Sequence, residues 1–245
     1  MKSKSKINFV FKNIFLQFYK IFGDIINFIA VTKTEKKSIF KIFKKNNIIV
    51  LPNPILFRNV RLKNKKILSF FGRINKHKNI ELMINSFISS NLDKSWQFHI
   101  YGINDDKEYF QRLKKIVNEK GFRNRIFFKK PIFNLNKKLE KMSEVYLNFL
   151  MSKSEVMGLS VLECLSVGTK SLVNINFDYP KNISQYLYFT KPNETEIKIQ
   201  IKKICSLFKS NNKKKSLSLS FKTIYTKMNI EKNYLNFLKK NLLSN

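Results

Sequence analysis

The chain has 245 residues, with 48 Lys and Arg against 16 Asp and Glu, so its formal net charge at pH 7 is +32. This length provides one large domain or two small ones, and a hydrophobic content of 43% excludes a disordered chain. Two cysteines, Cys164 and Cys205, are too few for a disulfide framework, and we expect both to be buried, reduced thiols.

The basic excess is concentrated in the two flanks of the chain. Residues 1–64 hold 14 basic and 2 acidic side chains, and residues 201–245 hold 11 and 1. Such a surface suits nucleic acid, but the excess is mostly lysine and accompanies Asn, Ile and Phe, which all have A/T-rich codons. The aromatic residues also fall at expected core positions. We therefore predict no nucleic-acid partner. The flanks form a solvated surface or contact an anionic membrane surface.

The apolar run at residues 7–31 is not predicted to span a membrane. Lys12, Lys20 and Asp24 interrupt it, so no run of about 18 uncharged residues exists. Because it also lacks the small-residue cleavage site of a signal peptide, we expect a cytoplasmic chain. The spacing at about residues 7–22 predicts an amphipathic helix that packs against protein or lies on a bilayer surface.

Three more elements are expected before residue 58. Residues 25–31 and 48–55 are apolar runs typical of strands. Residues 32–43 between them are predicted to form a helix with Thr32 or Thr34 as its N-cap.

From residue 65 onwards, short apolar runs alternate with segments of helical spacing. The predicted strands span 65–72, 96–102, 125–131, 145–150 and 171–176, and the predicted helices span 79–90, 105–121, 135–142 and 159–168. This alternation indicates βαβ units, so the predicted fold class is α/β, a Rossmann-like parallel sheet with helices on both faces. Because ligands bind such sheets outside the carboxyl ends of the strands, the loops after the first four strands form the candidate site.

The loop after the first of these strands contains two cations. Gly72 allows tight backbone packing, Arg73 leaves the end of the strand, and Lys78 begins the next helix. An Arg fork and a Lys point charge that converge on one crevice suit a diphosphate, whereas taken alone they also suit a solvated strand end. His77 in the same loop is expected to be solvated or to contact a ligand at its edge. His99, inside a strand, is expected to be structural.

The loop after the fourth strand, "SKSEVMGLSVLECLSVGTK", contains two of the few carboxylates. Glu155 lies in the loop, the helix begins near Gly158, and Glu163 lies on that helix. Free N–H groups at the helix start favour a phosphate, and the carboxylates can accept hydrogen bonds from hydroxyl groups. The alternatives are a helix-dipole partner for Glu155 and a solvated face for Glu163. Apolar neighbours make a buried, partnered carboxylate the better prediction for Glu163.

The segments "FFGRINKHKNIELMINSF", "FHIYG", "IFFKKPI" and "SEVMGLSVLECLSVGT" resemble the nucleotide-sugar-binding half of family 4 glycosyltransferases, which have the GT-B fold. The resemblance runs in order across about residues 25–175. Its most specific feature is the pair of glutamates at the family's spacing. It implies a retaining sugar transfer from a nucleotide-diphosphate donor, with no metal and no other cofactor.

The resemblance implies a role for each matching residue. Arg73 and Lys78, after Gly72, match the pair that neutralises the donor diphosphate. Glu155 matches the glutamate that holds the transferred sugar, and Glu163 matches the one that binds the ribose hydroxyls. The remaining matches are backbone groups, namely the amides of Met157, Gly158 and Leu159 for phosphate and the main chain of Ile132 for the base.

The resemblance also predicts the domain organisation. Residues 1–58 correspond to a small remnant of the N-terminal Rossmann-like domain with its linker, and residues 59–208 to the donor-binding domain. Residues 209–245 correspond to a basic connector, at 209–222, and a C-terminal crossing helix, at 230–243. The expected partners are the donor and a glycan or lipid-linked acceptor in cell-surface polysaccharide synthesis, at the cytoplasmic membrane face. The alternative is the donor-binding half of a split or degenerate enzyme, inactive alone and dependent on a separate chain for the missing domain.

Overall fold

The computed structural model describes residues 17, 28–44, 48–57, 65–177, 179, 181–208 and 225–242. The chain divides into two compact units, one formed by residues 1–54 and 227–245 and the other by residues 55–226. The helix predicted at 7–22 and the connector predicted at 209–222 lie outside the described residues.

The first unit contains a two-stranded parallel sheet. Strands β1 (Phe28–Ala30) and β2 (Ile48–Val50) pair in parallel, and helix α2 (Lys33–Phe43) connects them. The Thr32 hydroxyl accepts a hydrogen bond from the Glu35 amide at 3.0 Å, which makes Thr32 the N-cap. This confirms the predicted strand–helix–strand order. Helix α10 (Lys227–Leu242) belongs to the same unit.

The second unit is built on a parallel sheet of six strands in the order β5-β4-β3-β6-β7-β8. The strands are β3 (Lys65–Phe71), β4 (Gln97–Tyr101), β5 (Ile126–Lys129), β6 (Val145–Leu150), β7 (Lys170–Asn174) and β8 (Leu187–Thr190). Every neighbouring pair runs in parallel. The predicted fold class is confirmed, and β8 is a strand that the sequence analysis did not predict.

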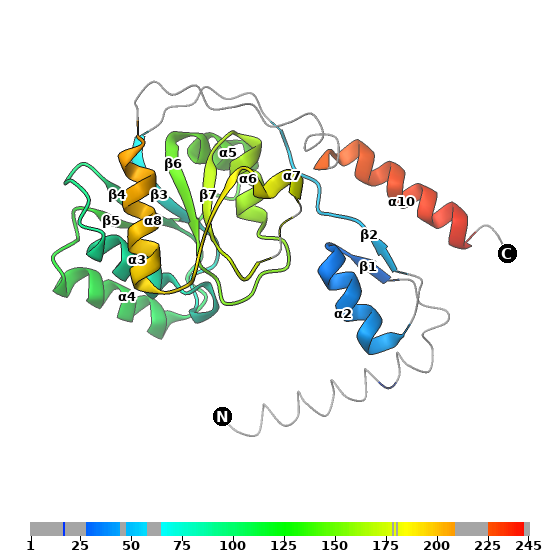
Figure 1. The fold of residues 1–245 in the computed structure, drawn as a ribbon, viewed down its shortest axis with the longest axis horizontal. Coiled ribbons are helices and arrows are strands. Elements are labelled where there is room, and N and C mark those ends of the chain that lie inside the picture. Colours follow the sequence, from blue (N-terminus) through cyan, green and yellow to red (C-terminus); the bar gives the residue numbers. More distant parts are fainter. Residues whose placement is uncertain are drawn as a thin grey trace. The chain divides into compact units, whose positions relative to one another are not determined.

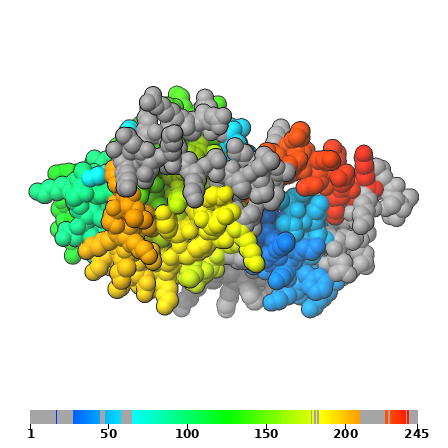
Figure 2. Space-filling model, turned by 45° about the horizontal axis from the view of Figure 1, so that its top comes forward, coloured from blue at the N-terminus to red at the C-terminus, as the bar shows by residue number. Residues whose placement is uncertain are grey.

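Helices cover both faces of this sheet (Figure 1). The helices α3 (Ile80–Ser89), α4 (Lys107–Glu119) and α8 (Glu194–Ser206) lie on one face, and α5 (Leu135–Glu144) and α6 (Leu159–Ser166) lie on the other. The 3-10 turn η1 (Lys76–Lys78) precedes α3, and the short helix α7 (Lys181–Ser184) precedes β8. In the space-filling view, α8 forms part of the outer surface of this unit, coloured yellow to orange (Figure 2).

The core lies between the sheet and these helices. Strands β3 and β6 are central and contribute fully buried apolar side chains, among them Leu68, Phe70, Leu147 and Phe149. A strand buried on both faces reads as a nearly continuous apolar run, which is why these segments could be predicted from the sequence. Because all six strands run in the same direction, the loops that follow them emerge at one edge of the sheet.

Side-chain N-caps fix where several of the helices begin. Asp106, Asn134 and Asn193 each accept a hydrogen bond from the amide three residues further on, at 2.9–3.0 Å. Helix α6 differs because its N-cap is Gly158, which has no side chain to cap the first amides. The sequence placed the start of α6 at this residue, and the structure confirms it.

Candidate functional site

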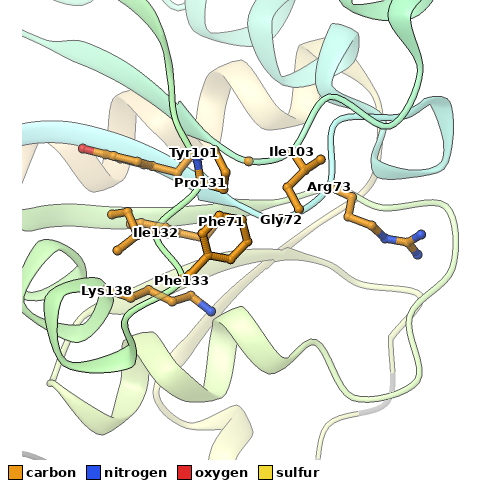
Figure 3. Close-up of a pocket in the computed structure, with 10 residues that line it drawn as sticks. Phe71, Gly72, Arg73, Tyr101, Ile103, Pro131, Ile132, Phe133 and Lys138 are labelled. Atoms are coloured by element: carbon orange, nitrogen blue, oxygen red, sulfur yellow. The ribbon is translucent and has the colours of Figure 1, made fainter.

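The loops at the carboxyl edge of the sheet form a pocket of about 200 Å³ (Figure 3). It lies beyond the ends of β3, β4 and β5, and its lining is mostly apolar. The lining residues are Phe71, Gly72, Arg73, Tyr101, Gly102, Ile103, Pro131, Ile132, Phe133 and Lys138. The predicted residues Gly72, Arg73 and Ile132 are thus brought together. Phe71 and Tyr101 stack with their ring centroids 4.8 Å apart, which gives the pocket a rigid aromatic wall.

Two glycines allow the first two loops to approach one another. A Cβ on Gly102 would lie 1.8 Å from the carbonyl oxygen of Gly72, so no other residue fits at position 102. The Gly72 amide donates a hydrogen bond to the Tyr101 carbonyl at 3.0 Å. The sequence showed that both strands end in glycine, and the close backbone contact explains why.

Arg73 is held by the loop after β4. Its guanidinium lies 3.2 Å from an Asp105 carboxylate oxygen, which also accepts a hydrogen bond from the Asn75 side-chain amide at 3.1 Å. The Arg73 side chain is 66% exposed. Figure 3 shows it at one end of the pocket, with its guanidinium pointing away from Lys138.

Lys78 contacts a different carboxylate. Its ammonium group forms an ion pair with Glu155, and the Ser152 hydroxyl donates to the same carboxylate oxygen at 2.7 Å. The two side chains of this pair are only 19% and 15% exposed. The two predicted cations are therefore each paired with a carboxylate, Lys78 with Glu155 and Arg73 with Asp105.

Two hydrogen bonds that involve its backbone fix the position of the loop that contains Glu155. The Asn174 side-chain amide at the end of β7 donates to the Ser152 carbonyl at 3.2 Å. The Lys153 amide donates to the His77 carbonyl at 2.8 Å. The loop after β6 is thus joined to the loops after β3 and β7, its neighbours in the sheet.

Glu163 is partnered and mostly buried, as predicted. Its carboxylate lies 2.6 Å from the ammonium nitrogen of Lys138, and the two side chains are 16% and 26% exposed. Lys138 comes from α5 and also lines the pocket, so it connects Glu163 to that pocket. The sequence analysis missed Lys138. One lysine among many on a helix has no distinguishing spacing.

The start of α6 lies between the two glutamates. Gly158 has a left-handed backbone with a φ of 60°, and Met157 and Leu159 flank it. The helix begins without a side-chain cap, and its first backbone hydrogen bond runs from the Val161 amide to the Gly158 carbonyl at 2.8 Å, so the amides before Val161 are the ones available to an anion. The predicted backbone ligands therefore lie in one tight turn.

His99 lies apart from this charged group, whereas His77 is in the 3-10 turn that ends at Lys78. His99, in β4, contacts Gln97 at 2.8 Å and Tyr101 at 3.4 Å through its two ring nitrogens. Burial lowers its pKa to about 4, and the positive charge of Lys129 adds to that effect. These contacts agree with the prediction that His99 is a structural residue. Among the described residues, no group of three or more His, Cys, Asp or Glu side chains has the arrangement of a metal site.

The arrangement combines features that bind a phosphorylated nucleoside. An apolar pocket with an aromatic wall suits a base, and the uncapped helix start and two nearby cations suit phosphate. The two carboxylates can accept hydrogen bonds from sugar hydroxyls. A parallel α/β sheet with this pocket at its carboxyl edge belongs to the doubly wound class, in which ligands bind at that edge.

The family follows from comparison with known proteins. Residues 53–219 match the sequence profile described as "Glycosyl transferases group 1", which covers more than half of the chain. The chain therefore belongs to the group 1 glycosyl transferase family. A comparison with curated protein sequences found no significant match.

Solved structures share the fold at low sequence identity. A TarM variant from S. aureus, in complex with fondaparinux, alpha-GlcNAc-glycerol and UDP, is 19% identical with a TM-score of 0.71. The pneumococcal O-GlcNAc transferase GtfA, in complex with UDP and GlcNAc, is 17% identical with a TM-score of 0.67. A glycosyltransferase from Rickettsia africae is 12% identical with a TM-score of 0.74.

The chain spans only part of these proteins. The TarM match covers 90% of this chain and 45% of TarM, and the GtfA match covers 91% of this chain and 47% of GtfA. The Rickettsia africae match covers 93% of this chain and 67% of that protein. Among the described residues, no helix has the length and apolar character needed to cross a membrane.

Proposed function

We propose that this chain binds a nucleotide-diphosphate sugar and takes part in transfer of the sugar to a glycan or lipid-linked acceptor. The carrying observation is that contacts and chain connections join these groups in series. Lys138 lines the pocket and pairs with Glu163, Glu163 lies on the helix that starts without a side-chain cap at Gly158, and Glu155, three residues before Gly158, pairs with Lys78. A donor has its parts in the same order, namely base, ribose, diphosphate and sugar.

Each part of the site then has one role. The base lies in the pocket against the main chain of Ile132, and the ribose hydroxyls donate to Glu163. The diphosphate accepts hydrogen bonds from the amides of the turn at residues 157–159 and from Arg73 and Lys78. These fixed positive groups stabilise the charge of the leaving diphosphate, which is the usual largest contribution to such catalysis.

The ion pair between Lys78 and Glu155 couples binding of the diphosphate to binding of the transferred sugar. The diphosphate competes with Glu155 for the Lys78 ammonium group. As Lys78 turns to phosphate, the Glu155 carboxylate becomes available to accept hydrogen bonds from the hydroxyls of the transferred sugar. Only a ligand with both a diphosphate and a sugar satisfies both groups, because either partner left alone is a mostly buried charge.

The finer features of the proposal follow the resemblance to family 4. Transfer proceeds with retention, because the donor phosphate and the acceptor oxygen approach the oxocarbenium-like carbon from one face. UDP is the favoured donor nucleotide, since TarM and GtfA were both solved with UDP. The basic residues of the flanks hold the chain at the cytoplasmic face of the membrane, where a lipid-linked acceptor for polysaccharide synthesis lies.

Calorimetric titration with UDP, GDP and ADP tests the donor site. We expect one nucleotide to bind, and we expect Arg73→Ala and Glu163→Gln to weaken that binding. Arg112→Ala is the matched control, because Arg112 is equally exposed at 65% and pairs with Glu81 at 2.7 Å. A folded chain that binds none of the three nucleotides would refute the proposal.

A second assay separates a complete transferase from its donor-binding half. The chain is incubated with the hexose derivative of the bound nucleotide and with lipid-linked acceptors, and release of the nucleotide is measured. Release that depends on the acceptor supports transfer by this chain. Tight binding without release supports the alternative, a donor-binding half that needs a separate chain.

A further inference from the structure

The loop after β7 places a buried tyrosine against the start of α6. The Tyr179 side chain is 9% exposed, and its ring packs near Phe189 with the ring centroids 6.4 Å apart. Its hydroxyl oxygen lies 2.5 Å from the position that a Cβ on Gly158 would occupy. Position 158 must therefore be glycine for two reasons, namely its positive φ and the space that this hydroxyl takes.

The Tyr179 hydroxyl has no hydrogen-bond partner among the described residues, although it is buried. An unpartnered buried hydroxyl is destabilising, and such groups are uncommon in folded proteins. Phenylalanine would fill the same space beside Gly158 without this cost. We therefore expect the Tyr179 hydroxyl to have a role other than packing.

The surroundings of the hydroxyl determine what kind of group could bind it. Burial raises its pKa well above the ordinary value, and the nearby Glu155 carboxylate raises it further, so the hydroxyl keeps its proton. It is thus a neutral hydrogen-bond donor. Glu155 itself already accepts hydrogen bonds from Lys78 and Ser152 on one oxygen.

The missing acceptor is best supplied by a ligand. The hydroxyl packs against Gly158, the residue that starts α6, where the unpaired N–H groups and the helix dipole favour an anion. An anionic oxygen on these amides would lie on the turn that the hydroxyl contacts. A hydrogen bond from a hydroxyl to a charged acceptor is among the stronger ones in proteins.

We propose that Tyr179 is a donor-binding residue whose hydroxyl donates a hydrogen bond to the distal phosphate of a bound nucleoside diphosphate. The inference rests on the proposed function, because that function supplies the diphosphate. It adds a ligand from the loop after β7 to those from the loops after β3 and β6. The distal phosphate is the one that leaves with the negative charge in sugar transfer, so this hydroxyl stabilises the leaving group.

The test compares a nucleoside diphosphate with the matching monophosphate. The affinities of UDP and UMP are measured by calorimetry for the wild-type chain and for Tyr179→Phe, with the guanosine and adenosine pairs run in parallel. We expect the variant to bind the diphosphate about tenfold more weakly and the monophosphate equally well. We also expect its thermal midpoint to be unchanged or higher, since an unpartnered buried hydroxyl is removed.

Tyr146→Phe is the matched control. The Tyr146 hydroxyl donates to the Ile204 carbonyl at 3.0 Å, so its removal should lower stability and leave both affinities unchanged. Equal diphosphate affinity in Tyr179→Phe and wild type would overturn the inference and leave the proposed function intact. An equal loss of diphosphate and monophosphate affinity would also overturn it, because the hydroxyl would then only shape the site. A wild-type chain that binds no nucleotide would instead refute the proposed function itself.

Discussion

Replacement of Gly158 by alanine separates two structural demands on one residue. The first is the left-handed backbone, which costs an L-residue about 1–2 kcal/mol. The second is steric, because the new Cβ would lie 2.5 Å from the Tyr179 hydroxyl oxygen, and overpacking of this kind costs about 1–3 kcal/mol. We therefore expect Gly158→Ala to lower the free energy of unfolding by about 2–5 kcal/mol.

The steric part should disappear in a Tyr179→Phe background. With the hydroxyl gone, the nearest atoms to the new Cβ are Cδ2 of Leu150 at 3.4 Å and Cζ of residue 179 at 3.6 Å, which are ordinary contacts. The alanine should then cost only the backbone contribution of about 1–2 kcal/mol. The double-mutant cycle should give a coupling of about 1–3 kcal/mol between the two positions.

Gly121 provides the control for the backbone contribution alone. It has a φ of 72°, and a Cβ there would meet nothing within 4 Å. Urea denaturation of Gly121→Ala should show a loss of about 1–2 kcal/mol with an unchanged m-value. If Gly158→Ala costs the same in both backgrounds, or no more than Gly121→Ala, the proposed contact between Gly158 and Tyr179 is wrong.

Three further predictions concern single side chains. Lys138→Met should lower the free energy of unfolding by about 1–3 kcal/mol, because it removes the charge partner of the mostly buried Glu163 carboxylate; an unchanged urea midpoint would contradict this. Because burial lowers the pKa of His99 to about 4, the unfolded chain takes up its proton first, so this residue makes stability fall as the pH drops from about 6.5 towards 4. His99→Asn should make the free energy of unfolding, measured with urea at pH 7 and at pH 5, fall less between these two pH values. An equally steep fall in the variant and the wild type would contradict this role of His99. Cys164 and Cys205 are buried, and burial raises the pKa of Cys205 to about 12, so a thiol reagent at pH 8 should label the chain only after unfolding; rapid labelling of the native chain would refute their burial.

The sequence determined the class of fold and the loops that form the site. Apolar runs that alternate with helical spacing gave the parallel sheet, because strands buried on both faces are mostly apolar along their length. Glycines at the ends of β3 and β4 marked loops that approach closely, and the glutamate pair marked the turn into α6. The direction of the strands then placed Arg73, Lys78, Glu155 and Glu163 at one edge, whatever their exact partners.

Some elements escaped prediction because their local pattern is ambiguous. In α8, the isoleucines at 197, 199 and 201 alternate with polar residues as in a strand. The structure nevertheless forms a helix, because Asn193 caps it and its buried face packs on α3. Strand β8 has only four residues, two of them half-buried, and gives little signal before its neighbour β7 is known.

Only the tertiary structure decided which groups pair with which. Asp105 meets Arg73, Lys138 meets Glu163, and Tyr179 meets Gly158, across separations of 21–32 residues. Such contacts depend on the strand order, which sets loops from distant parts of the chain beside one another, and on which side chains are buried there. Residue types and spacing contain neither piece of information, so the sequence could place the candidate ligands at one edge but could not predict the pairs among them.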